Sequence, residues 1–194
     1  MKQNQYDQII EEIKSKNLKK ISFSGTHGTG KTTSCYELAS LVKKEFGNKK
    51  LDVLSEVTYN SPFKINQETT TESQLWICVN QIQQELNRKQ KYDLIICDRT
   101  IIDCAAYTFR QMTIIKNNPP KSKIWFDLYN QILEIYKTYD NIFPHDLIIF
   151  KQIETNDYNK EDGKRDTNND FRTEVESIMK HAYTLFKDPN IMYV

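Results

Sequence analysis

Glycine, proline, cysteine and long apolar runs are all scarce in this sequence, and each scarcity excludes a class of protein. Its 194 residues include only 5 glycines and 5 prolines, too few for a disordered or low-complexity chain. Its 4 cysteines stand singly without a CxxC pair, which favours reduced core thiols over a metal site or a disulfide framework. No apolar run is long enough for a membrane span, and none near the start resembles a secretory signal. We therefore expect one globular domain over residues 1–194, in the cytoplasm.

Neither sign of charge dominates the sequence. The 27 Lys and Arg residues stand against 26 Asp and Glu residues, so the net charge is +1. Such a balance gives no overall field that would recruit nucleic acid or an anionic membrane. Any anion site must therefore be local, and we expect neither a nucleic acid nor a membrane as partner.

Apolar periodicity predicts strands and helices that alternate along the chain. The predicted strands are near-continuously aliphatic, which is typical of a parallel sheet covered by helices on both faces. A polar run at 154–170 has no periodicity and is a candidate mobile lid, and a short helix within residues 1–19 precedes the first strand. The strands are predicted at 21–24, 51–55, 93–97, 146–150 and 191–194, and the helices at 8–16, 32–46, 72–87, 101–115, 124–139 and 171–186.

The helix predicted over residues 72–87 is amphipathic and contains several glutamines. Gln74 and Gln81 fall on one side of it, where they would either read the edge of a bound base or face solvent. Its other face is predicted to lie in the core. That core face carries Leu75, Val79, Ile82 and Leu86.

The segment GTHGTGKT, residues 25–32, matches the G-x-x-x-x-G-K-[ST] pattern of a phosphate-binding P-loop. It lies between a predicted strand and a predicted helix, as that loop requires. Its glycines let backbone N–H groups converge on a phosphate, Lys31 reaches the β and γ oxygens, and Thr32 offers a hydroxyl to Mg²⁺. The predicted nucleotide-binding residues are Gly25, Thr26, His27, Gly28, Thr29, Gly30, Lys31, Thr32 and Thr33.

Two residues that follow the third strand extend this site. Asp98 ends the aliphatic run LIIC, where it would hold Mg²⁺ beside the P-loop or else act as a helix N-cap. Arg99 is one of few arginines in a lysine-rich chain, which suggests bidentate contact with a phosphate. His27 would either touch a phosphate or simply follow the turn of the loop.

With these elements the sequence resembles the P-loop nucleoside and nucleotide kinases, a group that includes thymidylate kinases, deoxynucleoside kinases and the nicotinamide riboside kinase domains of NadR-like proteins. The resemblance rests on GTHGTGKTT, on Glu56 after the second strand, on CDRTIIDCAAY after the third, and on DGKRDTNNDFR in the late polar run. It implies a three-layer α/β fold with a five-stranded parallel sheet of order 2-3-1-4-5. It also implies transfer of the γ-phosphoryl group of ATP, with Mg²⁺, to a small-molecule acceptor.

The resemblance also implies roles for individual residues. Glu56 matches an acidic residue that orients or deprotonates the acceptor hydroxyl, the alternative being an exposed carboxylate at the sheet edge. Arg99 matches an arginine that contacts the acceptor or a phosphate. Lys164, Arg165 and Arg172 fall where a lid closes over the phosphates, the alternative being a solvated charge run.

The identity of the acceptor stays open, because the chain reads Glu56-Val-Thr-Tyr where thymidylate kinases continue with proline. A nucleoside, a monophosphate and nicotinamide riboside are all compatible with the motifs, and a homodimer is also left open. The rival hypothesis is a regulatory NTPase or GTPase-like module with a protein or lipid partner. The sequence lacks the DxxG segment of such switches, and its NKED at 159–162 follows too many polar residues to be their base-reading motif.

Overall fold

The computed structural model describes residues 1–65, 68–154, 169–186 and 190–194. Five strands form one sheet in the order β2-β3-β1-β4-β5, and every neighbouring pair is parallel. This is the order that the resemblance implied, so the predicted fold class is confirmed. The strands are β1 (Lys20–Ser24), β2 (Leu51–Leu54), β3 (Leu94–Asp98), β4 (Leu147–Phe150) and β5 (Ile191–Tyr193).

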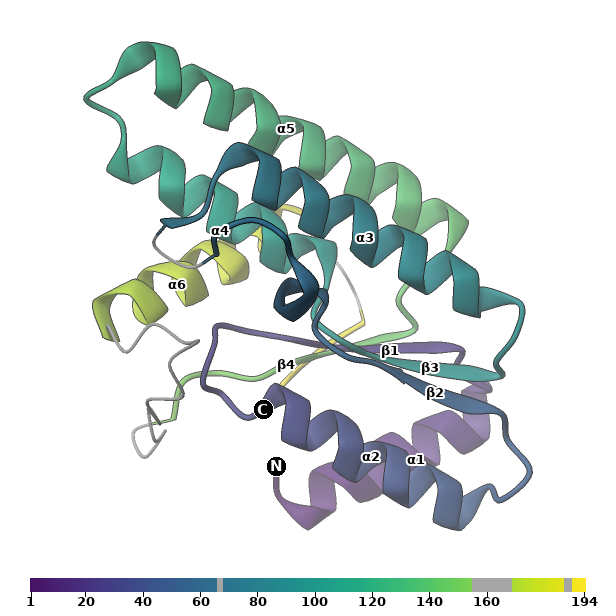
Figure 1. The fold of residues 1–194 in the computed structure, drawn as a ribbon. Coiled ribbons are helices and arrows are strands. Elements are labelled where there is room, and N and C mark those ends of the chain that lie inside the picture. Colours follow the sequence, from purple (N-terminus) through teal and green to yellow (C-terminus); the bar gives the residue numbers. More distant parts are fainter. Residues whose placement is uncertain (66–67, 155–168, 187–189) are drawn as a thin grey trace.

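Helices cover both faces of the sheet (Figure 1). The first two pack on one face and the other four on the opposite face. Because β3 and β4 are buried on both sides, they are almost continuously apolar rather than alternating, and the exception is Asp98 at the end of β3. The helices are α1 (Gln3–Lys16), α2 (Lys31–Glu45), α3 (Thr71–Lys89), α4 (Ile101–Ile114), α5 (Pro119–Ile142) and α6 (Asn169–Phe186), with a short 3₁₀ helix, η1 (Val57–Asn60), after β2.

The register of the central strands brings their carboxyl ends together. Phe23 of β1 pairs with Asp98 of β3, and Ser24 pairs with Phe150 of β4. The winding of the sheet reverses at β1, because β3 lies on one side of it and β4 on the other. Ligands of open parallel sheets bind beyond the carboxyl ends of the strands at such a switch point. The loop after β1 therefore occupies the expected position for a binding site.

Helix boundaries follow capping residues more closely than apolar periodicity. Thr100 is the N-cap of α4 and forms a capping box with Asp103. The helix predicted at 124–139 begins earlier, at Pro119, because a proline is tolerated in the first turn, where its missing N–H is not needed.

Most of the face of α3 that we expected in the core is exposed, so that prediction was wrong for three of its four residues. Leu75, Val79 and Leu86 are 46%, 50% and 41% exposed. Ile82, the fourth residue of this face, is partly buried and packs against the core. Most of this aliphatic stripe of α3 therefore lies on the surface of the described structure.

The buried face of α3 is largely polar, and its polar residues contact buried polar groups beneath it. Gln74 and Gln81 are both buried, so their predicted alternative as solvated residues was wrong. Glu85 is fully buried and its Oε2 lies 3.0 Å from Nζ of the equally buried Lys20. Tyr139 donates a further hydrogen bond to this carboxylate at 2.8 Å. A buried charge pair needs such partners to offset its lost hydration. Gln81, on the same face of α3, supplies another by donating to Glu85 at 2.7 Å.

The cysteines and the apolar character of the helices bear on two of the exclusions drawn from the sequence. The cysteines are buried free thiols, as predicted. Among the described residues, no helix combines the length and the apolar character that crossing a membrane requires.

Candidate active site

The loop between β1 and α2 has the conformation that its glycine spacing predicts. Gly25, Gly28 and Gly30 have positive φ angles of 135°, 77° and 74°. A Cβ atom at Gly25 would lie 2.4 Å from the carbonyl oxygen of Lys151, so no side chain fits there. Because α2 begins at Lys31, directly after Gly30, the free N–H groups of its first turn point toward the loop. The segment is thus a strand-loop-helix cradle for an anion.

Lys31 is the cation of this cradle. Its side chain folds back onto the loop, and Nζ donates a hydrogen bond to the carbonyl oxygen of Thr26 at 2.6 Å. Burial and the neighbouring positive charge of Arg99 lower the pKa of Lys31 to about 8. A bound phosphate would supply negative charge and so favour the protonated ammonium.

Asp98 and Thr32 lie side by side and fit a divalent cation. Thr32 Oγ1 donates a hydrogen bond to Asp98 Oδ2 at 2.5 Å. The other carboxylate oxygen, Oδ1, is buried and has no hydrogen-bond partner in the described part of the chain. A carboxylate oxygen beside a hydroxyl is a donor set that suits Mg²⁺. No cluster of three or more His, Cys, Asp or Glu was found among the described residues, so phosphate oxygens would complete the coordination.

Asp103, a residue that the sequence analysis missed, fixes the start of the P-loop. Its buried carboxylate accepts hydrogen bonds from Ser24 Oγ at 2.9 Å, Gly25 N at 3.2 Å and Thr100 Oγ1 at 2.7 Å. The signal for it was present in the capping-box spacing from Thr100 to Asp103. Since Thr100 is the N-cap of α4, the alternative role of Asp98 as a cap was wrong.

Glu56 and Arg99 form an ion pair at the carboxyl ends of β2 and β3. Glu56 Oε1 lies 2.6 Å from Arg99 Nε, and each side chain is 11% exposed, so Glu56 is not an exposed edge carboxylate. Burial alone would raise the pKa of Glu56, but the charges of Arg99 and Lys31 outweigh it, and the pKa lies below its usual value. Glu56 is therefore a carboxylate at neutral pH, able to accept a hydrogen bond from a bound hydroxyl.

The backbone of Arg99 is strained and is held in place by hydrogen bonds. Its φ angle is 103°, which is costly for a residue with a side chain. Its N–H donates to the carbonyl oxygen of Phe23 at 2.9 Å, and its own carbonyl accepts from Gln81 Nε2 at 3.3 Å. Gln81 also donates to Glu85 at 2.7 Å, and Glu85 pairs with Lys20. A continuous buried network thus fixes the backbone that presents the Arg99 guanidinium.

Helices α4 and α6 both contact the P-loop at His27. Arg172 of α6 is buried, and its Nε donates to the carbonyl oxygen of His27 at 3.1 Å. Tyr107 of α4 accepts a hydrogen bond from the His27 N–H at 3.2 Å. The His27 ring packs on Phe171, with 5.3 Å between ring centroids. Arg172 is therefore not a solvated charge, and His27 anchors the loop to two helices.

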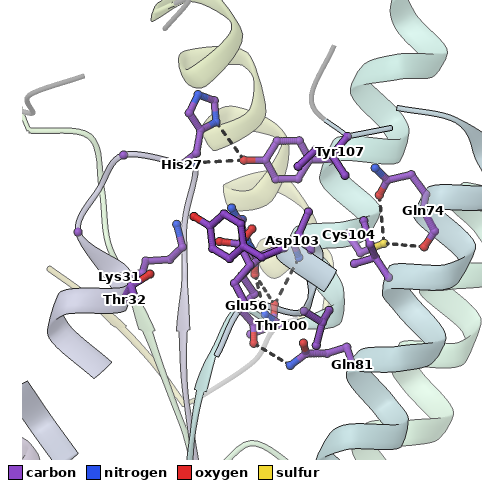
Figure 2. A pocket seen from close by; sticks show the side chains of 18 of the residues that line it. His27, Lys31, Thr32, Glu56, Gln74, Gln81, Thr100, Asp103, Cys104 and Tyr107 are labelled. Carbon is purple, nitrogen blue, oxygen red and sulfur yellow. Dashed lines mark hydrogen bonds and ion pairs between the residues drawn. The ribbon is translucent and has the colours of Figure 1, made fainter. Parts of the chain in front are cut away.

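A pocket joins these groups (Figure 2). Lys31 and Thr32 line it from the P-loop, and Gln74 and Gln81 lie opposite them on α3, with Glu56 between. Arg99 lines it as well. Its apolar and aromatic lining residues are Val57, Tyr59, Ile65, Ile77, Cys104 and Tyr107.

The other predicted site residues fall into three groups. His27, Gly28, Gly30 and Thr33 line the same pocket. Lys164 and Arg165 lie outside the described residues, as does most of the predicted lid. The residues that are buried within the loop rather than lining the pocket are Gly25, Thr26 and Thr29.

One protein family matches most of the chain. A family model described as an AAA domain matches residues 20–192. No curated protein matches the chain significantly.

Several solved structures share the fold. A thymidylate kinase from Ehrlichia chaffeensis is 16% identical with a TM-score of 0.59, and the match covers 91% of each chain. A NadR protein in complex with NR is 15% identical with a TM-score of 0.65, the match covering 91% of this chain but only 45% of that one. Deoxyadenosine kinase from M. mycoides is 16% identical with a TM-score of 0.53, covering 90% of this chain and 88% of that one. The fold is that of the P-loop nucleoside and nucleotide kinases, and its P-loop domain implies nucleotide binding.

Proposed function

The chain belongs to the AAA-domain family matched over residues 20–192, and we propose that it transfers the γ-phosphoryl group of ATP to a hydroxyl group of a nucleoside or nucleoside-like small molecule. The observation that carries the proposal is the Glu56–Arg99 ion pair, which shares one pocket with Lys31 and Thr32 of the P-loop. A kinase needs such a walled acceptor site beside the phosphates, whereas a regulatory NTPase does not.

The charges around the pocket favour an acceptor without a phosphate. Its described lining has two cations, Lys31 and Arg99, and two carboxylates, Glu56 and Asp103. Lys31 belongs to the P-loop and would face the phosphates of ATP. Arg99 already lies 2.6 Å from Glu56 and 3.5 Å from Asp103. A monophosphate would therefore compete with two carboxylates for Arg99, whereas a hydroxyl would find Glu56 ready to accept its proton in a hydrogen bond.

The remaining lining suits a flat, partly polar group such as a base. Val57, Ile77 and Tyr107 give the pocket apolar and aromatic surface, on which a planar ring can pack. Gln74 and Gln81 add carboxamides, which can donate and accept hydrogen bonds. A nucleoside has both features together with a hydroxyl group.

The proposed reaction forms a bond from the acceptor oxygen to the γ-phosphorus and breaks the bond to the bridging oxygen of ADP. Glu56 orients the hydroxyl and receives its proton as the bond forms, while Lys31 offsets the charge on the phosphoryl oxygens. Mg²⁺ held by Thr32 and Asp98 would neutralise further phosphate charge. The protein thus acts by positioning and by electrostatic stabilisation.

Nucleotide capture should weaken as the pH rises through about 8, the pKa of Lys31. Below that pH the ammonium attracts the phosphates, and above it the free protein loses this charge. We expect kcat/KM for ATP, which reports pKa values of the free enzyme, to be level at neutral pH and to fall in alkaline solution. In Lys31→Arg, whose guanidinium stays charged, any residual activity should lose this fall. A parent profile that stays level to about pH 10 would contradict the assignment.

Asp98→Asn and Thr32→Ala should each raise the Mg²⁺ concentration for half-maximal activity about 10- to 100-fold, the usual effect of disturbing the groups around a metal. Nucleotide affinity measured without Mg²⁺ should change much less, because neither residue faces the base. The measurement is a Mg²⁺ titration of activity, with the surface variant Asp127→Asn on α5 as control. Titration curves that coincide with that of the control would show that Thr32 and Asp98 do not hold the metal.

An ATP-consumption screen over nucleosides, nucleoside monophosphates and nicotinamide riboside tests the proposal, with mass spectrometry of the acceptor. Consumption that rises with a hydroxyl acceptor and yields its phosphorylated product supports the proposed function. Stimulation by monophosphates alone would overturn the acceptor class. ATP hydrolysis that no acceptor changes would favour the regulatory NTPase with a protein or lipid partner.

A further inference from the structure

Lys151 directly follows β4, and its backbone is fixed against the start of the P-loop. Its N–H donates a hydrogen bond to the carbonyl oxygen of Ser24 at 2.9 Å. Its own carbonyl oxygen is the atom that leaves no room for a side chain at Gly25. Figure 1 shows the chain that leaves β4 close to the loop between β1 and α2. The side chain of Lys151 therefore starts from a fixed position beside the P-loop.

The side chain of Lys151 reaches the other end of the same loop. Its Nζ donates a hydrogen bond to Ser34 Oγ at 3.0 Å, and Ser34 is buried near the start of α2. A Cβ atom at Gly30 would lie 3.6 Å from the same Nζ. Since Gly30 is the residue directly before α2, Lys151 places an ammonium group where the P-loop passes into the helix.

The ammonium of Lys151 forms no ion pair with a carboxylate in the described part of the chain. Its hydrogen-bond partner Ser34 carries no charge. Lys151 is half-buried, so water and salt screen its charge less than they screen a surface lysine. Buried charges in proteins are normally paired, and an ammonium has three N–H groups, so it can donate to a ligand as well as to Ser34. A cation of this kind beside a phosphate-binding loop points to an anionic ligand.

The position of Lys151 in the sheet indicates which phosphate it would meet. Glu56 follows β2 and Arg99 follows β3, whereas β4 lies on the opposite side of β1. Lys151 does not line the pocket that contains Glu56 and Arg99. In-line transfer requires the γ-phosphoryl group to face the acceptor, so the rest of the nucleotide extends toward the β4 side. Because Lys31 serves the β- and γ-phosphates, the α-phosphate is the one left for Lys151.

We propose that Lys151 is a second cation of the nucleotide site and that its ammonium contacts the α-phosphate of bound ATP. The inference rests on the proposed function, because the acceptor pocket sets the direction of the nucleotide. The charge of the α-phosphate does not change during transfer of the γ-phosphoryl group, so this contact stabilises the ground state and the transition state equally. Lys151 therefore contributes to affinity for the nucleotide and not to kcat.

Calorimetric titration with ATP and with ADP, both without Mg²⁺, tests this role in Lys151→Gln, which removes the charge but can still donate to Ser34. We expect Kd to rise about 10- to 100-fold, the usual effect of losing a hydrogen bond to a charged group. The factor should be the same for both nucleotides, because both contain an α-phosphate. Lys44→Gln, at an exposed lysine of α2, should bind like the parent. Ser34→Ala should lose much less affinity than Lys151→Gln, and equal losses would mean that the contact is merely structural. Circular dichroism checks that each variant is folded.

The two diastereomers of the α-phosphorothioate analogue of ADP test the contact itself. Sulfur is a weak hydrogen-bond acceptor, so the diastereomer that turns its sulfur toward Lys151 should bind the parent less tightly than the other. Lys151→Gln should reduce the ratio of the two affinities. An unchanged ratio, or an ADP affinity equal to that of Lys44→Gln, would overturn the inference and leave the proposed function intact. A parent that binds neither ATP nor ADP would overturn both.

Discussion

Lys31→Ala is expected to lower kcat for phosphoryl transfer by at least about 10²- to 10³-fold, the cost of removing one charge-stabilising group from a preorganised site. Lys31 is the first residue of α2 and the cation of the P-loop. No other lining residue in the described part of the chain could replace it, because Arg99 is already paired with Glu56. Steady-state and single-turnover kinetics with ATP and the acceptor found by the screen measure the effect.

Two further variants make the result interpretable. Lys44→Ala changes an exposed lysine of the same helix and should leave turnover unchanged. Lys31→Met keeps most of the side-chain length and should be as inactive as Lys31→Ala. Because burial lowers the pKa of Lys31 to about 8, the folded state disfavours its charge, so loss of that charge should not lower the thermal midpoint near neutral pH. If Lys31→Ala turned over as fast as Lys44→Ala, the P-loop would have no catalytic role.

Glu56→Gln should reduce kcat by about 10²- to 10⁴-fold while sparing affinity for ATP, if the acceptor is a hydroxyl group. The amide can still accept a hydrogen bond but has no charge to stabilise the departing proton. Arg99→Ala should have a smaller effect on kcat, because Arg99 then acts mainly by holding Glu56 in place. Both variants should be measured with a nucleoside and with its monophosphate.

The opposite pattern would identify a phosphate acceptor. A monophosphate needs a cation, so Arg99→Ala would then raise the acceptor KM sharply and Glu56→Gln would change little. The controls are Glu45→Gln, exposed on α2, and Arg88→Ala, whose partner is Asp52 rather than a pocket residue. If neither Glu56→Gln nor Arg99→Ala altered the phosphorylation of any acceptor, the kinase assignment would give way to the regulatory NTPase.

Much of this arrangement was predictable because it depends on local pattern. The P-loop has a fixed glycine spacing, and aliphatic strands alternating with helices specify a sheet covered on both faces. The pairing of Thr32 with Asp98 follows from the same logic, since parallel strands end at one edge of the sheet. The closeness of Glu56 and Arg99 follows in the same way, because β2 and β3 are neighbouring parallel strands.

The features that sequence reasoning missed depend on long-range pairing. The stripe of α3 looked like a core face because periodicity shows that a helix has two faces, not which one turns inward. Which face turns inward depends on the ion pair between Glu85 and the buried Lys20, two residues that lie far apart in the sequence. The strained φ of Arg99 is likewise invisible locally, because the hydrogen bonds that hold it come from Phe23 and Gln81.

The hydrogen bond from Arg172 to the carbonyl oxygen of His27 has a consequence for motion. No described residue of α6 lines the pocket, yet α6 is tied to the backbone that would surround the phosphates. Local opening of α6 would therefore release the P-loop, and a ligand that stabilises the P-loop must make that opening rarer, because coupling between two sites is reciprocal. Amide hydrogen exchange in α6 should accordingly slow when nucleotide binds, so the last helix becomes a remote reporter of P-loop occupancy.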